Sequence, residues 1–469
     1  MNIKKIAQFS IGPLGAGVLS LVTLPFVAWS FSPEDVGRLT MLQVVLSLSV
    51  TFFSLAMHQA YVREYYVEHD KEALLKTSLA PGLMFLTFTV LFLTILPFSY
   101  SKLIFGIDSY FLTMLLLLGV YSSFFINFLA HLLRMEGRGI AFSATQIAPK
   151  FMFLVLVGAI VIFNFRTDSS LLIFMQIVSL VFSAFVFLWL TRQAVIPAVN
   201  KKIDISLLKR MLRFSLPLVL GGMAYWGLTA MDRFFLKALV GLEEVGVYAV
   251  AASLAASVAL VSTIFSNLWH PTVYKWLKDG IEPKNIQAAS EIMTLVVAVI
   301  WTFFGIFSWV IPAFLPDEYY SVKYLIVACV SMPLFYMLSE TTVVGIGISR
   351  RSGFSFLASG VALLCNAILN YITIPILGAS GAALASVLAF FIFFIVRTES
   401  SAYVWQSIPR LKIYVVTILY VLTTIVMVLS EADIESFYLV WVGILALTVL
   451  LFTKRIANSF ESYKIISFG

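Results

Sequence analysis

Long apolar stretches follow one another along almost the whole chain. Fourteen of them lie within residues 11–452, and a segment such as LGVYSSFFINFLAHLL shows no period-two alternation. A bilayer core about 30 Å thick needs roughly 20 apolar residues per helix, whereas barrel strands alternate apolar and polar positions. The pattern predicts membrane-spanning helices at 11–30, 39–62, 79–98, 110–133, 145–163, 170–190, 214–239, 245–268, 292–312, 322–347, 354–374, 381–396, 413–429 and 437–452.

The expected fold class is therefore an all-α polytopic membrane protein with about fourteen transmembrane helices. The composition agrees, because 61% of the residues are hydrophobic and 12% are charged, against about 25% charged residues in an average globular chain. The two cysteines, Cys329 and Cys365, fall inside predicted spans, where a free thiol behaves as a small hydrophobe. We expect no disulfide and no soluble domain.

The basic residues give an orientation. With the N-terminus inside, 24 of the 31 Lys and Arg residues fall in one set of alternate loops, four in the other set and three within spans. Positive charge accumulates on the cytoplasmic side of membrane proteins, so both termini are predicted to be cytoplasmic. The net charge of +7 then reflects topology and attraction to anionic headgroups of the lipid bilayer, and no nucleic-acid partner is expected.

The two halves of the chain resemble each other faintly. The segment SPEDVGRLTML after the first span is echoed by GLEEVGVYAVA after the seventh. Six spans per repeat preserve orientation, which predicts pseudo-symmetric lobes with a substrate path in a central cavity between them. The predicted parts are an N-lobe at 1–191, an interfacial linker helix at 192–213 with Asp204 as its cap, a C-lobe at 214–397, and a C-terminal hairpin with its tail at 398–469.

Two predicted spans carry stripes of polar residues at helical spacing. The second span has Gln43, Ser47, Thr51, Ser54 and His58, and the eleventh has Ser355, Ser359, Asn366, Asn370 and Thr373. Polar side chains in a membrane span by default face a bundle interior or a wet cavity. They also serve as contacts between helices, and the sequence leaves both interpretations open.

Ionisable residues within spans are the further candidates. In the fifth span, Gln146 and Lys150 lie one turn apart, and Gln146 is a further candidate for the substrate site. Lys150 either lines the cavity or extends toward the interface. Asp232, Arg233 and Lys237 lie in the seventh span and form either a structural ion pair or a substrate contact. Glu340, with His58, is the candidate for ion coupling, and a structural role is the alternative.

No motif of a soluble-type active site occurs. The sequence has no Walker loop, metal-ligand spacing or nucleophile elbow, so we expect no enzyme activity, cofactor or metal. A membrane polysaccharide polymerase or glycosyltransferase would need a large outer loop for its catalytic residues. The predicted outer loops here are about ten residues long or shorter, which argues against that class.

Two segments resemble a known family. Residues 222–254, with Asp232 and Arg233 followed by Glu244, Val245, Gly246 and Tyr248, are similar to the span-seven to span-eight signature of the polysaccharide transporter family. These proteins are the O-antigen flippases of the multidrug/oligosaccharidyl-lipid/polysaccharide superfamily. A second match is NAILNYITIPILGASGAALAS, which contains Asn366, Asn370, Pro375, Gly378 and Gly381.

The resemblance implies an activity and partners. It implies a flippase that moves an undecaprenyl-pyrophosphate-linked oligosaccharide across the bacterial inner membrane by alternating access. Lys150 and Arg233 would face the diphosphate, and the polar stripes would bind sugars. A proton or sodium ion and other polysaccharide-assembly membrane proteins are expected as further partners.

Two relatives within the superfamily fit less well. A multidrug exporter is expected to carry an acidic residue in its early spans, and the predicted spans one to six contain no Asp or Glu. The lipid II flippases share the additional C-terminal hairpin but have several arginines in their early spans. This chain has no arginine before Arg38, so a peptidoglycan-precursor role is not favoured.

Overall fold

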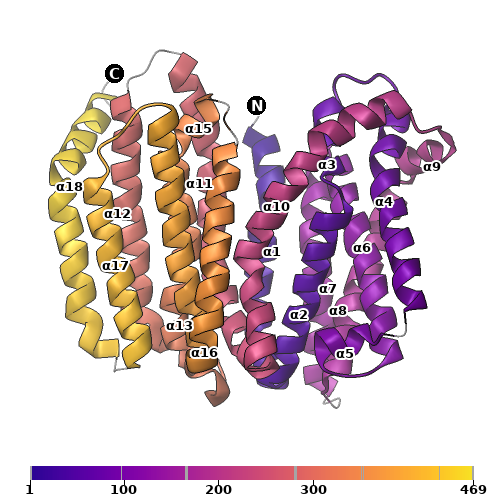
Figure 1. Ribbon diagram of the computed structural model, residues 1–469, viewed down its shortest axis with the longest axis horizontal. Helices are drawn as coiled ribbons and strands as arrows, with labels where there is room; N and C mark the ends of the chain where they lie inside the picture. The colour runs from indigo at the N-terminus through magenta and orange to yellow at the C-terminus, as the bar shows by residue number, and fades with distance from the viewer. Residues whose placement is uncertain are drawn as a thin grey trace. The chain divides into compact units, whose positions relative to one another are not determined.

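Long helices joined by short connections make up the structure, a computed structural model that describes residues 3–96, 98–163, 167–278, 283–349, 351, 353–431 and 434–466 (Figure 1). Within these ranges every regular element is a helix. The α-helices are α1 (Ile3–Ser30), α2 (Pro33–Phe53), α3 (Met57–Glu64), α4 (Lys71–Ile95), α5 (Tyr100–Phe105), α6 (Tyr110–Met135), α7 (Gly139–Phe163), α8 (Ser169–Leu190), α9 (Arg192–Asn200), α10 (Ile205–Leu239), α11 (Leu242–Lys278), α12 (Pro283–Phe307), α13 (Val322–Cys329), α14 (Ser331–Thr342), α15 (Val344–Ser349), α16 (Gly353–Val404), α17 (Leu411–Ser430) and α18 (Tyr438–Ile466). Three short 3₁₀ helices cover Ser308–Phe314, Asp317–Tyr319 and Ile434–Phe437.

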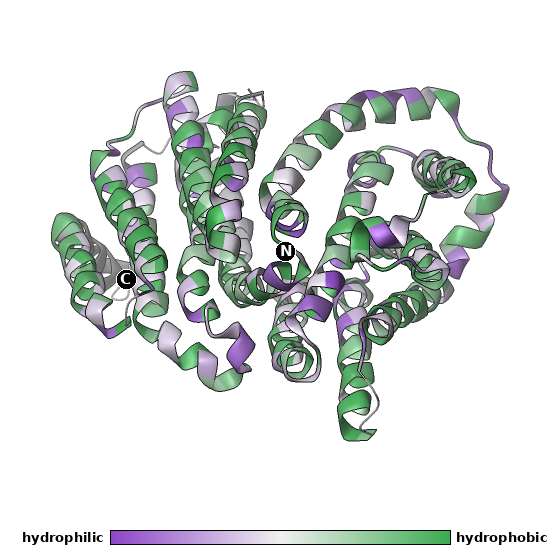
Figure 2. Ribbon diagram, turned by 60° about the horizontal axis from the view of Figure 1, so that its bottom comes forward, coloured by the Kyte–Doolittle hydropathy of each residue, from purple (hydrophilic) through white to green (hydrophobic). Residues whose placement is uncertain are grey.

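Among the described residues, 13 helices or helical segments are long and apolar enough to cross a membrane. One of them, α16, is 52 residues long and contains a kink at Gly378, whose φ is 53° and ψ is −130°. The predicted spans at 354–374 and 381–396 are its two parts. Figure 2 shows that hydrophobic residues dominate the long helices. The predicted all-helical membrane fold is confirmed, and Cys329 and Cys365 are free thiols as expected.

Polar residues mark where the helices begin. Ser32 and Asp35 form a reciprocal capping box at the start of α2, in which each side chain accepts a hydrogen bond from the other residue's backbone N–H. This start places Glu34 and Asp35 in the first turn of α2, where Arg38 lies 2.5 Å from Glu34 and 3.2 Å from Asp35. Two acidic residues assigned to a loop by the sequence analysis thus belong to the helix and are paired.

The predicted single span at 39–62 is wrong at its inner part. Helix α2 ends at Phe53, Leu55 and Ala56 adopt left-handed backbone angles with φ of 49° and 50°, and α3 begins at Met57. Left-handed angles are uncommon outside glycine and interrupt a right-handed helix. No glycine or proline marks this break in the sequence, so hydropathy alone did not reveal it.

The chain divides into an N-terminal unit, Met1–Phe234, and a C-terminal unit, Phe235–Gly469. This division falls inside α10, which runs without interruption from Ile205 to Leu239. Of the segment 192–213 predicted as a linker helix, the first part forms α9, and residues 205–213 begin the helix that contains the seventh span. The position of the first turns of α10 in the membrane interface stays a prediction. The boundaries of the two lobes and the central cavity between them also stay predictions.

In the N-terminal unit α1 packs closely along α7. The backbone N–H of Gly12 donates to Ser143 Oγ at 3.0 Å, and a Cβ at Gly12 would lie 2.9 Å from Ser143 Cα. Small residues permit such close helix packing in membranes. A hydrophobic core joins α3, α4, α6 and α8 to the first turns of α10 through Met57, Leu74, Leu133, Phe187 and Met211.

In the C-terminal unit α14 is buried among α11, α12 and α16. The C-terminal hairpin of α17 and α18 packs on α12, where Thr302 and Tyr420 share a hydrogen bond of 2.7 Å. Gly305 makes room for the indole of Trp441, since a Cβ there would lie 2.4 Å from the ring. The hairpin is thus an integral part of this unit.

Candidate functional site: a polar cavity in the N-terminal unit

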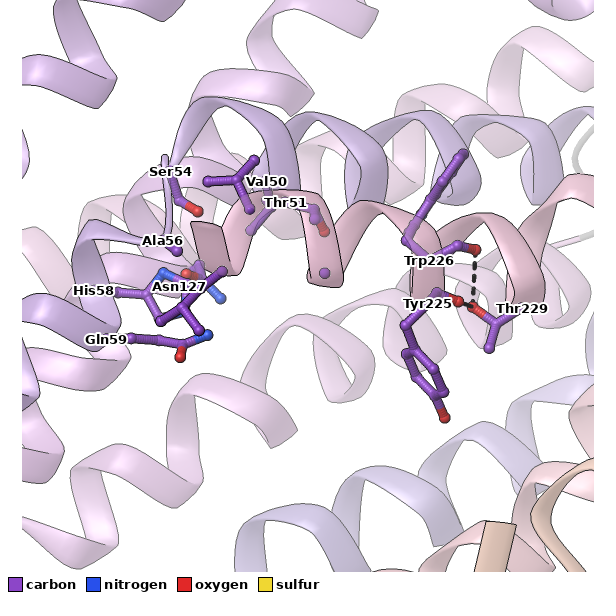
Figure 3. Close-up of a pocket in the computed structure, with 13 residues that line it drawn as sticks. Val50, Thr51, Ser54, Ala56, His58, Gln59, Asn127, Tyr225, Trp226 and Thr229 are labelled. Atoms are coloured by element: carbon purple, nitrogen blue, oxygen red, sulfur yellow. Dashed lines mark hydrogen bonds between the residues drawn. The ribbon is translucent and has the colours of Figure 1, made fainter. Parts of the chain in front are cut away.

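A cavity of about 400 Å³ lies within the N-terminal unit (Figure 3). Four segments contribute to it: the end of α2, the turn into α3 with its first residues, the middle of α6, and the α10 face that follows Pro217. The lining residues are Val50, Thr51, Ser54, Ala56, His58, Gln59, Asn127, Leu218, Val219, Gly222, Tyr225, Trp226 and Thr229. The break between α2 and α3 therefore borders the cavity and turns His58 and Gln59 toward it.

Hydrogen-bonding groups gather at one end of the cavity. Ser54 Oγ, His58 Nδ1 and Asn127 Oδ1 are buried there and have no hydrogen-bond partner among the described residues. The imidazole of His58 stacks on that of His131, with ring centroids 4.6 Å apart. Because an unsatisfied buried polar group is unfavourable, this end of the cavity is suited to a ligand that brings its own donors and acceptors.

Aromatic side chains form the other end. Tyr225 and Trp226 follow one another on α10, with Thr229 one turn later (Figure 3). The indole Nε1 of Trp226 donates to Ser47 Oγ at 3.0 Å, which fixes the ring to α2. Gly222, on the same face of α10, also lines the cavity, and a Cβ there would lie 3.6 Å from the Thr51 methyl group.

Ion pairs hold the beginning of α10 on the α3–α4 connection. Arg210 lies 3.3 Å from Glu64 and also pairs with Glu68. Lys201 lies 2.8 Å from Asp70, and this hydrogen bond lowers the pKa of the exposed Asp70 carboxyl. These contacts position the helix that supplies six of the thirteen cavity residues.

Asp204 caps the same helix. Its carboxylate accepts hydrogen bonds from the backbone N–H groups of Ser206 at 2.8 Å and Leu207 at 3.1 Å, and from the Ser206 hydroxyl at 2.7 Å. The Ser206 hydroxyl bond is the main cause that lowers the pKa of Asp204. The predicted role of Asp204 as a helix cap is confirmed by these bonds.

The polar stripe predicted on the second span is only partly brought together. Thr51, Ser54 and His58 line the cavity, and Ser47 reaches it through Trp226. Gln43 is exposed on α2 and Gln146 is half-buried on α7, and neither is among the lining residues.

Lys150 connects two helices. Its ammonium donates to Ser20 Oγ at 2.6 Å and to the carbonyl oxygen of Ala16 at 3.2 Å, both on α1. Lys150 does not line the cavity. The sequence analysis considered only cavity lining or an interfacial position for Lys150. The structure shows a third role, hydrogen bonding between α7 and α1.

The charged group on α10 lies just past the cavity. The guanidinium of Arg233 donates to the carbonyl oxygen of Thr229, whose residue lines the cavity. Asp232 is fully buried, and Lys237 is half-buried one turn after Arg233. None of the three is among the lining residues, and the thirteen that are include no Lys, Arg, Asp or Glu.

The two asparagines of the eleventh span lie in the C-terminal unit on α16. Asn366 and Asn370 are fully buried, and the Asn370 amide donates to Asn366 Oδ1 at 2.9 Å. Their side chains form a contact within one helix. Their proposed contact with sugars stays a prediction.

Glu340 has a partner that the sequence analysis did not identify. Its carboxylate lies 3.0 Å from the guanidinium of Arg397, on α16, and the side chain of Glu340 is 2% exposed. Arg397 also donates to Ser339 Oγ, and the Trp269 indole donates to the Glu340 carbonyl. Arg397 follows the predicted span at 381–396, whereas α16 continues to Val404 and includes it. This ion pair supports a structural role for Glu340. A role of Glu340 in ion coupling stays a prediction.

Sequence reasoning missed ten of the thirteen cavity residues, among them the polar and aromatic side chains of Gln59, Asn127, Tyr225, Trp226 and Thr229. The signal for Asn127 was present, because Asn127 and His131 are spaced i, i+4 within the fourth span and share a helix face. For Tyr225 and Trp226 no such signal existed, since aromatic residues are common throughout these spans.

Comparison with known proteins identifies a family for this chain and solved structures with a similar fold. The profile of the family described as polysaccharide biosynthesis protein matches residues 3–275. No curated protein matches the sequence. Among solved structures, the lipid II flippase MurJ in an inward closed conformation is 15% identical with a TM-score of 0.68, over 96% of this chain and 99% of that one. An inward-facing multidrug resistance MATE family transporter of the MOP superfamily is 16% identical with a TM-score of 0.56, over 83% of this chain and 95% of that one. At these identities the likeness to both structures is one of fold.

Proposed function

The chain belongs to the polysaccharide biosynthesis protein family, and from this premise we propose that it is a flippase for a lipid-linked oligosaccharide. In this proposal it moves undecaprenyl-pyrophosphate-linked repeat units of O-antigen, capsule or exopolysaccharide across the bacterial inner membrane, with both termini in the cytoplasm. It does so by alternating access of its two lobes and makes or breaks no covalent bond.

The observation that carries the proposal is a hydrogen-bonding cavity within a unit of apolar helices. A sugar chain cannot cross hydrocarbon without losing its hydrogen bonds to water, which costs several kcal/mol per buried polar group. The polar side chains that line the cavity of about 400 Å³ can replace water as hydrogen-bond partners of the sugar. The polyprenyl tail needs no such path, because it remains in the bilayer.

The diphosphate needs cations, and we assign it to Lys150 and Arg233. Lys150 is exposed on α7 and has three N–H donors, two of which contact α1 in this structure. Arg233 lies one turn past the cavity. Asp232 and Lys237 complete this proposed group, and Glu340 and His58 are the proposed sites for a coupling proton or sodium ion.

A gene deletion tests the function. Loss of a flippase should stop surface polysaccharide and leave polyprenyl-linked repeat units on the cytoplasmic leaflet, and a plasmid copy should reverse both effects. Normal polysaccharide in the deletion strain would contradict the proposal. Unchanged repeat units together with increased sensitivity to organic cations would instead favour a multidrug exporter.

A further inference from the structure

We propose that the cavity of the N-terminal unit binds the uncharged saccharide part of the substrate and excludes its diphosphate. This inference rests on the proposed function and assigns one part of the substrate to one place in the chain. It follows from the chemistry of the lining, taken one end at a time.

The polar end offers acceptors and donors that a polyhydroxylated ligand can satisfy together. Ser54 is 4% exposed, and its hydroxyl oxygen is unpartnered, as are His58 Nδ1 and Asn127 Oδ1. A sugar hydroxyl both donates and accepts hydrogen bonds, so adjacent hydroxyls can pair with an amide oxygen, an imidazole nitrogen and a serine hydroxyl. Figure 3 shows these side chains grouped beside Gln59, whose amide adds donors and an acceptor.

The aromatic end suits the other surface of a pyranose ring. Axial C–H groups give a sugar ring an apolar face, and the negative face of an aromatic ring attracts such weakly positive hydrogens. The indole of Trp226 is held in place by its hydrogen bond to Ser47 Oγ and by an edge-to-face contact with Phe234, with ring centroids 6.0 Å apart. Trp226 and the hydrogen-bonding side chains lie at the two ends of one cavity (Figure 3), so a saccharide that spans it can place an apolar ring face at one end and hydroxyls at the other.

The uncharged lining of the cavity favours a sugar over a diphosphate as its ligand. No Lys, Arg, Asp or Glu occurs among the thirteen lining residues, and an anion placed among uncharged groups loses its hydration without an opposite charge. Lys150 contacts α1 instead of the cavity. The volume of about 400 Å³ lies in the roughly 300–1,000 Å³ range of small-molecule sites.

Binding to the purified full-length chain in nanodiscs tests the inference. The probes are the oligosaccharide released by mild acid from the host's own lipid-linked pool, inorganic pyrophosphate, and tetraphenylphosphonium as an organic cation. Calorimetry should detect binding of the oligosaccharide, and pyrophosphate should not compete with it, because the cations proposed for the diphosphate, Lys150 and Arg233, lie outside the cavity.

Variants then locate the site. Asn127→Leu keeps the side-chain size and removes a buried, unpartnered amide oxygen, so thermal stability should be retained or raised while oligosaccharide affinity falls about tenfold. Gly222→Trp should fill the cavity and abolish binding, and Trp226→Phe should retain more affinity than Trp226→Ala. Gln176→Leu on α8, which removes a half-buried amide outside the cavity, is the control and should bind as the wild type does.

The results that overturn the inference are distinct. Equal oligosaccharide affinity in wild type, Asn127→Leu and Gly222→Trp would remove the sugar from this cavity. Pyrophosphate binding that these variants weaken would reverse the assignment, and tetraphenylphosphonium binding alone would make it an organic-cation site. Accumulated repeat units in the deletion strain combined with any of these outcomes would leave the flippase function standing and reject only this site.

Discussion

The carboxylate of Glu244 accepts a hydrogen bond of 2.7 Å from the backbone N–H of Ala379. Glu244 lies in the first turn of α11, and Ala379 follows the kink of α16 at Gly378. A side chain at Gly378 would place its Cβ 2.6 Å from Glu244 Oε2. The two sequence motifs that resemble the polysaccharide transporter family therefore meet in space, and at this contact they build the fold of the C-terminal unit.

The first prediction is that Glu244→Ala destabilises the protein by about 1–3 kcal/mol. The substitution leaves the backbone N–H of Ala379, just after the kink, without its carboxylate acceptor. Thermal unfolding of the detergent-solubilised protein measures this. Glu243→Ala, on the exposed neighbour, is the matched control and should have no effect. Equal stability of the two variants would show that the Glu244 bond contributes nothing.

The second prediction separates charge from helix packing at Lys150. Lys150→Arg should retain transport and Lys150→Ala should lose about tenfold or more, as expected for a charged hydrogen bond to substrate. Ser20→Ala removes the shorter of the two interhelical hydrogen bonds of Lys150 and leaves the ammonium, so it should transport normally. Surface polysaccharide at matched protein level is the measurement. If Ser20→Ala is as impaired as Lys150→Ala, Lys150 acts by holding α1 on α7.

The third prediction concerns the buried pair of Glu340 and Arg397. Removing one partner of a buried ion pair costs about 3–5 kcal/mol, whereas removing both costs less. We expect Arg397→Met to lower thermal stability strongly and Glu340→Gln with Arg397→Met to recover part of the loss. A stable Glu340→Gln single variant whose transport no longer responds to pH would assign Glu340 to ion coupling instead.

The fourth prediction concerns the cap of α10. Asp204→Ala should increase hydrogen exchange in residues 205–216 several-fold at neutral pH, because the first N–H groups lose their acceptor. The hydrogen bonds lower the pKa of Asp204 in the folded state. The cap therefore contributes fully above the ordinary aspartate pKa, and its contribution is lost as the pH falls through the lowered value. The difference between variant and wild type should shrink correspondingly in acid, and a difference independent of pH would contradict this account.

The fifth prediction is topological. Reporter fusions after Leu190 and after Phe452 should report the cytoplasm, and a fusion within residues 431–435 should report the opposite side, because the basic residues cluster in alternate loops. The readout is paired activity of a cytoplasm-specific and a periplasm-specific reporter. A C-terminus on the outer side would refute the fourteen-span topology.

The sequence by itself determined the class of this protein. Transfer of a span into lipid depends on the summed hydropathy of about 20 adjacent residues, so the helices could be identified without any tertiary contact. Family motifs such as Glu244 and Gly378 could likewise be recognised from sequence, although their contact with each other could not.

Tertiary structure decided what the polar residues do. The partner of Glu340 lies 57 residues away, on a different helix, and that of Lys150 lies 130 residues away, and hydropathy contains no information on such pairings. The cavity depends on two left-handed residues, Leu55 and Ala56, which have no special residue type. Their backbone angles are set by the packing around them, which only the folded chain defines.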